Sequence, residues 1–213
     1  DAEAEVPAQQ VDIVDPLMAS LDLSTLEIHS IAFGDVYLAL PMKAQSFEER
    51  LPMTQDGIDF EVEIRVELDA ERRTLMAQLL AVDPVWGLPP PAGIGFLPPE
   101  NGTGRGQGSI TFSVQPRQGL PSGTEFRNVA EITFDFIETI ATNQIDPHDP
   151  SLGTDPSKEA LNTVDAEPPR SRLIAPDYSE SETFEVSWSG EDSHSGIAHF
   201  DIYTREGEGP WRL

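Results

Sequence analysis

Residues 58–68 read IDFEVEIRVEL, with an apolar residue at every even position and a charged residue at every odd position. Successive side chains of a β-strand point to opposite faces of the sheet. The pattern therefore predicts a strand with one face against a core and the other in water. Residues 69–73 have the composition of a turn, and residues 74–82 are expected to return as the second strand of a hairpin.

The same period of two recurs on both sides of this hairpin. We expect further strands at residues 11–14, 26–40 (with a break near Gly34), 47–51, 110–115 and 126–136. The stretch from Gly87 to Gly108 is rich in Pro and Gly and predicts a long surface loop. Helical turns are expected only near residues 17–24 or 157–161. Evenly spaced strands with hardly any helical period predict an all-β fold, an antiparallel β-sandwich.

A change of composition after Asn143 predicts three parts of the chain. Residues 1–145 would form the sandwich, and residues 146–167, rich in Pro and Asp, an acidic linker. Residues 168–213 would begin a second sandwich, with strands at 183–188 and 197–203. About 45 residues supply only part of the roughly 90 to 100 that such a sandwich needs. We expect its apolar face to be covered by more of a longer polypeptide or by another chain.

Composition excludes several classes of function. The chain has 38 Asp and Glu against 13 Lys and Arg, a formal net charge of −25. This field opposes nucleic acid and attracts cations. The chain has no Cys, which removes thiol catalysis and thiolate metal sites. No apolar run approaches the roughly 20 residues that span a bilayer, so no membrane span is expected.

Two stretches carry a resemblance to known modules. Residues 104–143, GRGQGSITFSVQPRQGLPSGTEFRNVAEITFDFIETIATN, resemble the closing segment of an uncharacterised Ig-like β-sandwich module of very large secreted bacterial proteins, especially those of planctomycetes and cyanobacteria. Residues 184–213, FEVSWSGEDSHSGIAHFDIYTREGEGPWRL, resemble the first strands of the fibronectin type III-like module that follows it. The resemblance implies an extracellular structural or adhesive spacer, often beside calcium-binding repeats, and brings no catalytic residues.

Acidic residues supply the candidate metal ligands. Asp146, Asp149, Asp155 and Asp165 lie in the linker, and Asp192 lies in a loop of the last segment. Calcium takes six to eight oxygen ligands in irregular geometry, so a linker of carboxylates and exposed carbonyls suits it. The spacing is not that of an EF-hand. The alternatives are a solvated acidic linker and, around Asp192, an ordinary turn rich in Asp, Ser and Gly.

Other candidates favour structural interpretations. The four His residues are scattered without a metal-ligand spacing. The glycines of residues 102–108 precede a strand, whereas a phosphate-binding loop precedes a helix. Trp188 alternates with Phe184 and Val186 and is expected in a core, which leaves Trp86 as the tryptophan able to stack on a sugar.

The sequence thus predicts a non-enzymatic module of a cell-surface or filament-forming protein, with calcium as an accompanying ion. Its expected partners are neighbouring modules of the same polypeptide or identical chains joined by β-strand complementation. The alternative is a carbohydrate-binding or accessory sandwich of a secreted enzyme that degrades polysaccharides and binds glycans.

Overall fold

The computed structural model describes residues 4–136 and 138–213. Regular structure consists of strands and two single-turn 3-10 helices, which confirms the predicted all-β class. The chain divides into two compact units, one of residues 1–118 with 126–162 and one of residues 119–125 with 163–213. Each unit is described by itself.

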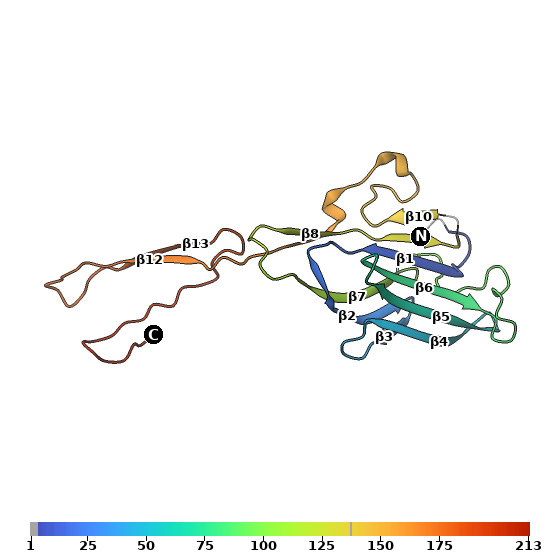
Figure 1. Ribbon diagram of the computed structural model, residues 1–213, viewed down its shortest axis with the longest axis horizontal. Helices are drawn as coiled ribbons and strands as arrows, with labels where there is room; N and C mark the ends of the chain where they lie inside the picture. The colour runs from blue at the N-terminus through green and yellow to red at the C-terminus, as the bar shows by residue number, and fades with distance from the viewer. Residues whose placement is uncertain (1–3, 137) are drawn as a thin grey trace. The chain divides into compact units, whose positions relative to one another are not determined.

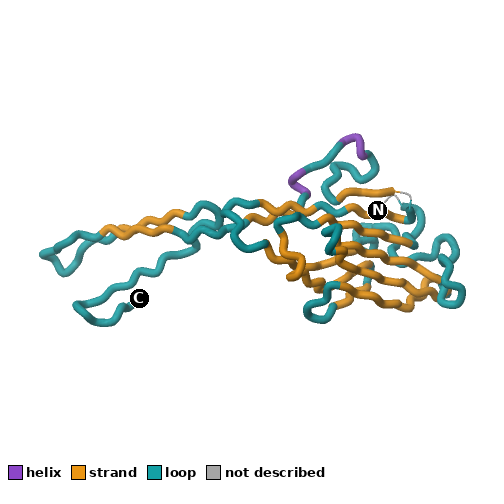
Figure 2. The backbone as a smooth tube through the Cα atoms, viewed as in Figure 1, coloured by secondary structure: helices purple, strands orange, loops and turns teal. Residues whose placement is uncertain are grey.

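Two antiparallel sheets form the sandwich of the first unit (Figure 1). The larger has the strand order β10 (Glu138–Ala141), β9 (Glu131–Phe134), β1 (Gln10–Pro16), β6 (Thr74–Val82), β5 (Ile58–Asp69) and β4 (Ser46–Gln55). The smaller has the order β3 (Val36–Ala39), β2 (Leu21–Phe33) and β7 (Gly108–Pro116). Figure 2 shows how long loops join these strands. One sheet therefore has twice as many strands as the other.

The predicted hairpin is the centre of the larger sheet. β5 pairs with β6 from Glu61 opposite Val82 to Asp69 opposite Thr74. Its even-numbered residues from Phe60 to Val66 are buried, as the alternation requires. On the outer face, Arg50 of β4 forms ion pairs with Glu61 and Glu63. These pairs offset part of the repulsion among the carboxylates of β5.

Side chains from both sheets form one core. β2 contributes Leu26, Ile28, Ile31 and Phe33, which pack with the buried residues of β5 and β6. Partly buried residues of β7 and β9 border this cluster, namely Ile110, Phe112, Val114, Ile132 and Phe134. The smaller sheet thus covers the middle of the larger one, and the core becomes shallower toward β7 and β9.

The long loop before β7 is not wholly on the surface. Ile94 and Phe96 are buried, and the ring of Phe96 meets that of Phe33 edge-on with 5.4 Å between centroids. The N–H of Phe96 donates to the carbonyl of Ala8, and the N–H of Ala8 donates to the carbonyl of Leu97. The prediction of a surface loop was wrong here because two apolar side chains close one end of the sandwich.

The helical turn expected near residues 17–24 is absent from the described structure, and β2 already begins at Leu21. The guanidinium of Arg73 donates to the carbonyls of Met18 and Leu21 at 2.6 and 2.9 Å. Those carbonyls are therefore satisfied by a side chain of the β5–β6 hairpin, not by a helical ladder.

The strand predicted at residues 126–136 is two strands. β8 (Glu125–Asn128) pairs with β11 (Ala160–Thr163), whereas β9 pairs with β1 and β10. Two residues separate β8 from β9, and the alternation continues through this break, which is why the sequence pattern did not show it.

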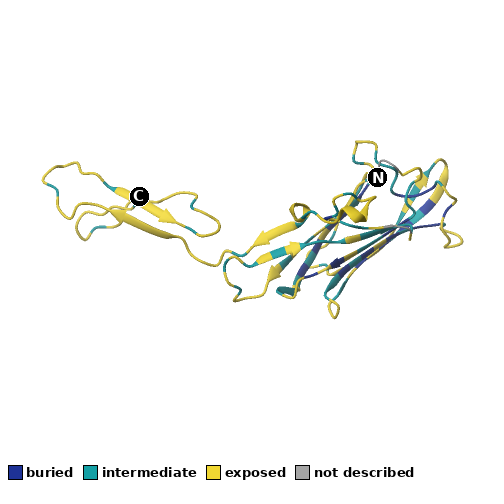
Figure 3. Ribbon diagram, turned by 90° about the horizontal axis from the view of Figure 1, so that it is seen from above, coloured by how far each residue is buried: buried dark blue, intermediate teal, exposed yellow. Residues whose placement is uncertain are grey.

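The second unit holds one strand pair, β12 (Arg170–Ile174) with β13 (Ser187–Glu191). Strands were predicted at residues 183–188 and 197–203. The first overlaps β13 only at its end, and the second has no strand. No residue from 163 to 213 is buried (Figure 3). Trp188 is 51% exposed, so its expected place in a core was wrong, because no second layer packs on β12 and β13 among these residues.

Candidate functional sites

Three of the predicted calcium ligands hold turns in the loop before β11. Asp149 and Asp155 stand at the N-caps of the 3-10 helices Pro150–Leu152 and Pro156–Lys158. One carboxylate oxygen of Asp155 accepts from both the N–H and the hydroxyl of Ser157, and Asp149 does the same with Ser151. Asp146 accepts the N–H of His148 at 2.9 Å. Each carboxylate caps the backbone two residues ahead, which is ordinary turn chemistry.

The other two predicted ligands belong to the second unit. Asp165 accepts the N–H of Glu167 at 3.3 Å. One oxygen of Asp192 accepts the N–H groups of His194, Ser195 and Gly196 between 2.9 and 3.0 Å. These hydrogen bonds hold the pKa of the Asp192 carboxyl below its ordinary value. The turn predicted for this stretch is what the structure contains.

The described residues include no group of three or more His, Asp or Glu side chains arranged to hold a metal ion. The carboxylates of residues 146–155 share one loop, but each has an oxygen engaged in its own turn. This arrangement does not form a ready calcium site. Calcium binding by these residues therefore stays a prediction for experiment.

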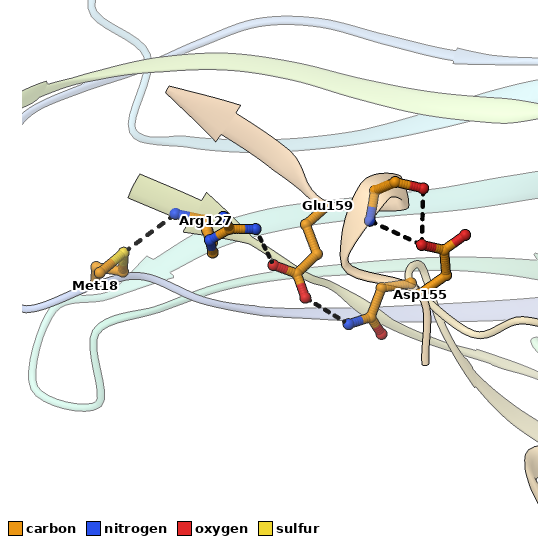
Figure 4. A network of polar contacts seen from close by, with 6 residues as sticks. Met18, Arg127, Asp155 and Glu159 are labelled. Atoms are coloured by element: carbon orange, nitrogen blue, oxygen red, sulfur yellow. Dashed lines mark hydrogen bonds and ion pairs between the residues drawn. The ribbon is translucent and has the colours of Figure 1, made fainter. Parts of the chain in front are cut away.

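A polar network fastens the same loop to the sandwich (Figure 4). Arg127 of β8 forms an ion pair with Glu159 at 3.2 Å, and the other oxygen of Glu159 accepts from the amide of Asn143 at 3.0 Å. Asn143 is buried and follows β10. The backbone N–H of Arg127 also donates to the sulfur of Met18. Glu159 thus joins the start and the end of the acidic loop to β8.

β1 contains a buried carboxylate that was not predicted from the sequence. Asp15 is 5% exposed, and one of its oxygens accepts from the amide of Asn128 at 2.9 Å. The other oxygen has no partner. Burial raises the pKa of the Asp15 carboxyl, and the hydrogen bond from Asn128 partly opposes that shift. The alternation of β1 could have marked the position, since Asp15 shares its face with Val11 and Ile13.

The N–H groups of the glycine-rich loop bind a carboxylate of the same loop. The carboxylate of Glu100 accepts the N–H groups of Gly102, Gly104 and Gly106 at 2.6, 2.9 and 3.0 Å. These bonds, that from Gly104 above all, lower the pKa of the Glu100 carboxyl. The N–H groups that would hold a phosphate in another protein are occupied here by a side chain of the same loop.

Trp86 is presented by a compact turn. The carboxylate of Asp83 accepts the N–H groups of Val85 and Trp86, and the carbonyl of Asp83 accepts that of Gly87. Trp86 is 77% exposed, and its neighbours Val85 and Leu88 are also exposed. The turn therefore displays an apolar tip whose backbone is fixed by hydrogen bonds.

Comparison with known proteins gives one match. Residues 94–147 match the model of a domain of unknown function, DUF7619. The matched stretch holds β7, β8, β9 and β10, and overlaps the segment on which the resemblance to a secreted β-sandwich module rests. No curated protein and no solved structure matches the chain.

None of the helices in the described residues has the length and apolar character needed to cross a membrane.

Proposed function

We propose that this chain is a non-enzymatic structural or adhesive part of a large extracellular protein. In this proposal the first unit is an Ig-like sandwich, and the second belongs to a fibronectin type III-like module. The host protein would stand on the cell surface or form filaments. The all-β sandwich and the match to DUF7619 support a module of this kind without assigning it a chemistry.

The observation that carries the proposal is the exposed apolar surface of the second unit. Its aromatic residues other than Phe200 are each more than half exposed, as Phe184 (58%), Trp188 (51%) and Trp211 (61%) show. Each Å² of such surface gains about 25 cal/mol when it is covered. Large exposed apolar patches mark contacts with other protein bodies, and these residues are the ones that would form such a contact. A neighbouring module of the same polypeptide is the partner we propose.

Immunolabelling of intact source cells tests the proposal. Antibodies raised against the whole chain should label unpermeabilised cells, and the label should remain with the surface layer after the membrane is dissolved. Labelling that requires permeabilisation overturns the extracellular assignment. If detergent releases the labelled protein from the cell surface as a small free protein, the proposed structural role is overturned.

A specific observation supports carbohydrate binding as the second candidate. The turn at residues 83–88 holds Trp86 outward, and an exposed indole on a fixed backbone is suited to stack on a sugar ring. This candidate predicts binding to a glycan array that is lost in Trp86→Ala. The matched control, Tyr37→Ala, removes another exposed aromatic ring (70% exposed) and should leave binding unchanged. Equal loss in both variants contradicts a site at Trp86.

A further inference from the structure

β7 has a free edge. It is the last strand of the order β3-β2-β7 and pairs with β2 from Gly108 opposite Phe33 to Pro116 opposite Leu21, with shifts of register between Asp22 and Glu27 and between Ile28 and Ser30 of β2. Within residues 4–136 and 138–213 no strand pairs with its other side. An edge strand offers a row of unpaired N–H and C=O groups that can template another strand.

The other edges of the two sheets are protected, and that of β7 is not. β4 carries Glu48, Glu49 and Arg50 and has Pro52 inside it, the devices by which natural sheets block edge pairing. β3 and β10 have four residues each, too few for a stable new ladder. β7 has nine residues, reads GSITFSVQP, has no charged residue and has Pro only at its last position.

An apolar slot lies beside this edge, between the two sheets. It has a volume of about 280 Å³ and is lined by Ile110 of β7, by Ile31 and Phe33 of β2, and by Val11, Ile13, Ile132 and Phe134 of the larger sheet. Phe96, Leu97 and residues 106–109 also line it. This volume is at the lower limit for a small-molecule pocket and suits a few aliphatic side chains.

The slot exists because the larger sheet extends beyond the smaller one. Ile132 and Phe134 of β9 lie opposite Ile13 and Val11 of β1 in the ladder and so share their inner face. They are only half-buried, as are Ile110, Phe112 and Val114 of β7. One more strand beside β7 would cover both sets, since neighbouring strands stand about 4.8 Å apart and packed sheets about 10 Å apart.

We propose that β7 accepts an extended peptide strand that inserts alternate apolar side chains into this slot. Its outward side chains would be basic or neutral, because a chain of net charge −25 repels acidic partners and a second copy of itself. The inference deepens the proposed function by naming the partner as a polypeptide strand, and it rests on that function. The backbone supplies affinity through the ladder, and the slot selects the alternating pattern.

Site-specific quenching tests the proposal on the whole chain. The chain has no Cys, so Thr111→Cys on β7 and Glu48→Cys on β4 each create a single thiol for a fluorophore. Both residues are exposed, and Thr111 alternates with Ile110 and Phe112, so its label lies outside the slot. The probe is a nine-residue peptide in which valine alternates with lysine and threonine, with a quencher at one end.

The expected result is saturable quenching at position 111 and none at position 48. A second peptide of the same sequence, N-methylated at every peptide bond, keeps its side chains and charge but has no N–H to donate to the ladder from either edge. It should bind about tenfold more weakly or worse, because it forfeits several hydrogen bonds. Equal quenching at both positions, or equal affinity of the two peptides, would mean that the peptide is held by charge attraction alone. Either result overturns the proposal.

Two further outcomes have definite meanings. In one, sedimentation is concentration-dependent and the label at position 111 is already shielded before the peptide is added. That result assigns the edge of β7 to a second copy of the chain and overturns the proposal that a peptide binds there. Absence of binding in an otherwise folded protein also overturns it. Neither result bears on the cell-surface labelling above, so the failure of strand uptake and the failure of the proposed function are distinguishable.

Discussion

Asn128→Ala should destabilise the protein far more at pH 7 than at pH 3. The amide of Asn128 donates to the buried carboxylate of Asp15, whose other oxygen has no partner. A hydrogen bond to a charged group contributes about 1.5–3 kcal/mol, and a neutral one about 0.5–1.5 kcal/mol. The variant should therefore lose about 1.5–3 kcal/mol where Asp15 is ionised and about 0.5–1.5 kcal/mol where it is protonated, so the loss should grow as the pH rises from 3 to 7.

The sign follows from the direction of the pKa shift. Burial holds the pKa of folded Asp15 above its unfolded value of about 3.9. The stability linked to this group is thus complete below that value and is lost as the pH rises through the folded pKa. Asn128 limits the loss by stabilising the ionised form, so its removal matters most where Asp15 is charged. Glu100, whose pKa is lowered, contributes in the opposite direction and is unchanged in both proteins.

Urea denaturation at the two pH values measures the difference. Urea is preferred to guanidinium because it adds no ions and leaves the electrostatics unscreened. A pH of 3 lies below the isoelectric point near 4.2, so the protein carries charge in both measurements. Asn101→Ala is the control, since Asn101 is exposed and its side-chain oxygen accepts from the N–H and the hydroxyl of Thr103 within its own loop. Equal losses for Asn128→Ala at both pH values would refute the reasoning.

Three other predictions concern the acidic loop and the limits of the fold. Glu159→Ala should speed proteolysis within residues 144–158, seen by mass spectrometry, because it releases both ends of that loop; unchanged cleavage contradicts the anchoring role. Millimolar calcium should raise the melting temperature above that in sodium chloride of equal ionic strength, and a chelator should reverse the rise. Identical melting curves in the two salts contradict calcium binding. A peptide of residues 94–147 should give the circular dichroism spectrum of an unfolded chain, because β7 lacks its partner β2 and β9 lacks its partner β1. A spectrum typical of β-strands would show that β7 and β9 form without these partners.

The central part of the fold could be predicted from sequence because its signal is local. The alternation in residues 58–68 fixes which side chains of β5 are buried, and the break near Gly34 falls at the β2–β3 turn, where that glycine has a φ of +52°. Both depend on neighbours within a few residues. The same pattern cannot say which strands become partners, since pairing depends on contacts distant in the sequence.

The errors have a common physical origin. Ile94 and Phe96 lie among prolines and glycines, and only the open end of the sandwich gives them a place to be buried. Residues 17–24 were read for local helix formation, whereas the carbonyls there are taken by Arg73 from a distant hairpin. The buried charge of Asp15 likewise has its partner 113 residues away. In each case tertiary contacts override a weaker local preference.

The candidate sites divide in the same way. The turn at Asp192 was foreseen, because Asp, Ser and Gly in close succession satisfy one another locally. The occupied glycine loop was not, since nothing in its spacing shows that Glu100 folds back onto its own N–H groups. The exposed edge of β7 could not be inferred at all, because an edge is defined by the strand that is missing beside it.

The match to DUF7619 leads to a last prediction. The matched residues, 94–147, hold β7 and β9, which both line the apolar slot, and Phe96, which also lines it. The deepest core strands, β5 and β6, lie outside the match. If strand uptake is a property of this stretch, proteins that contain DUF7619 should keep the edge uncharged. Alignment of their β7 segments should then show small or neutral residues where this chain has Ser109, Thr111 and Ser113. Lysine or glutamate at those positions in most members would mean that the edge is ordinarily blocked, and the acceptor site would be confined to this chain.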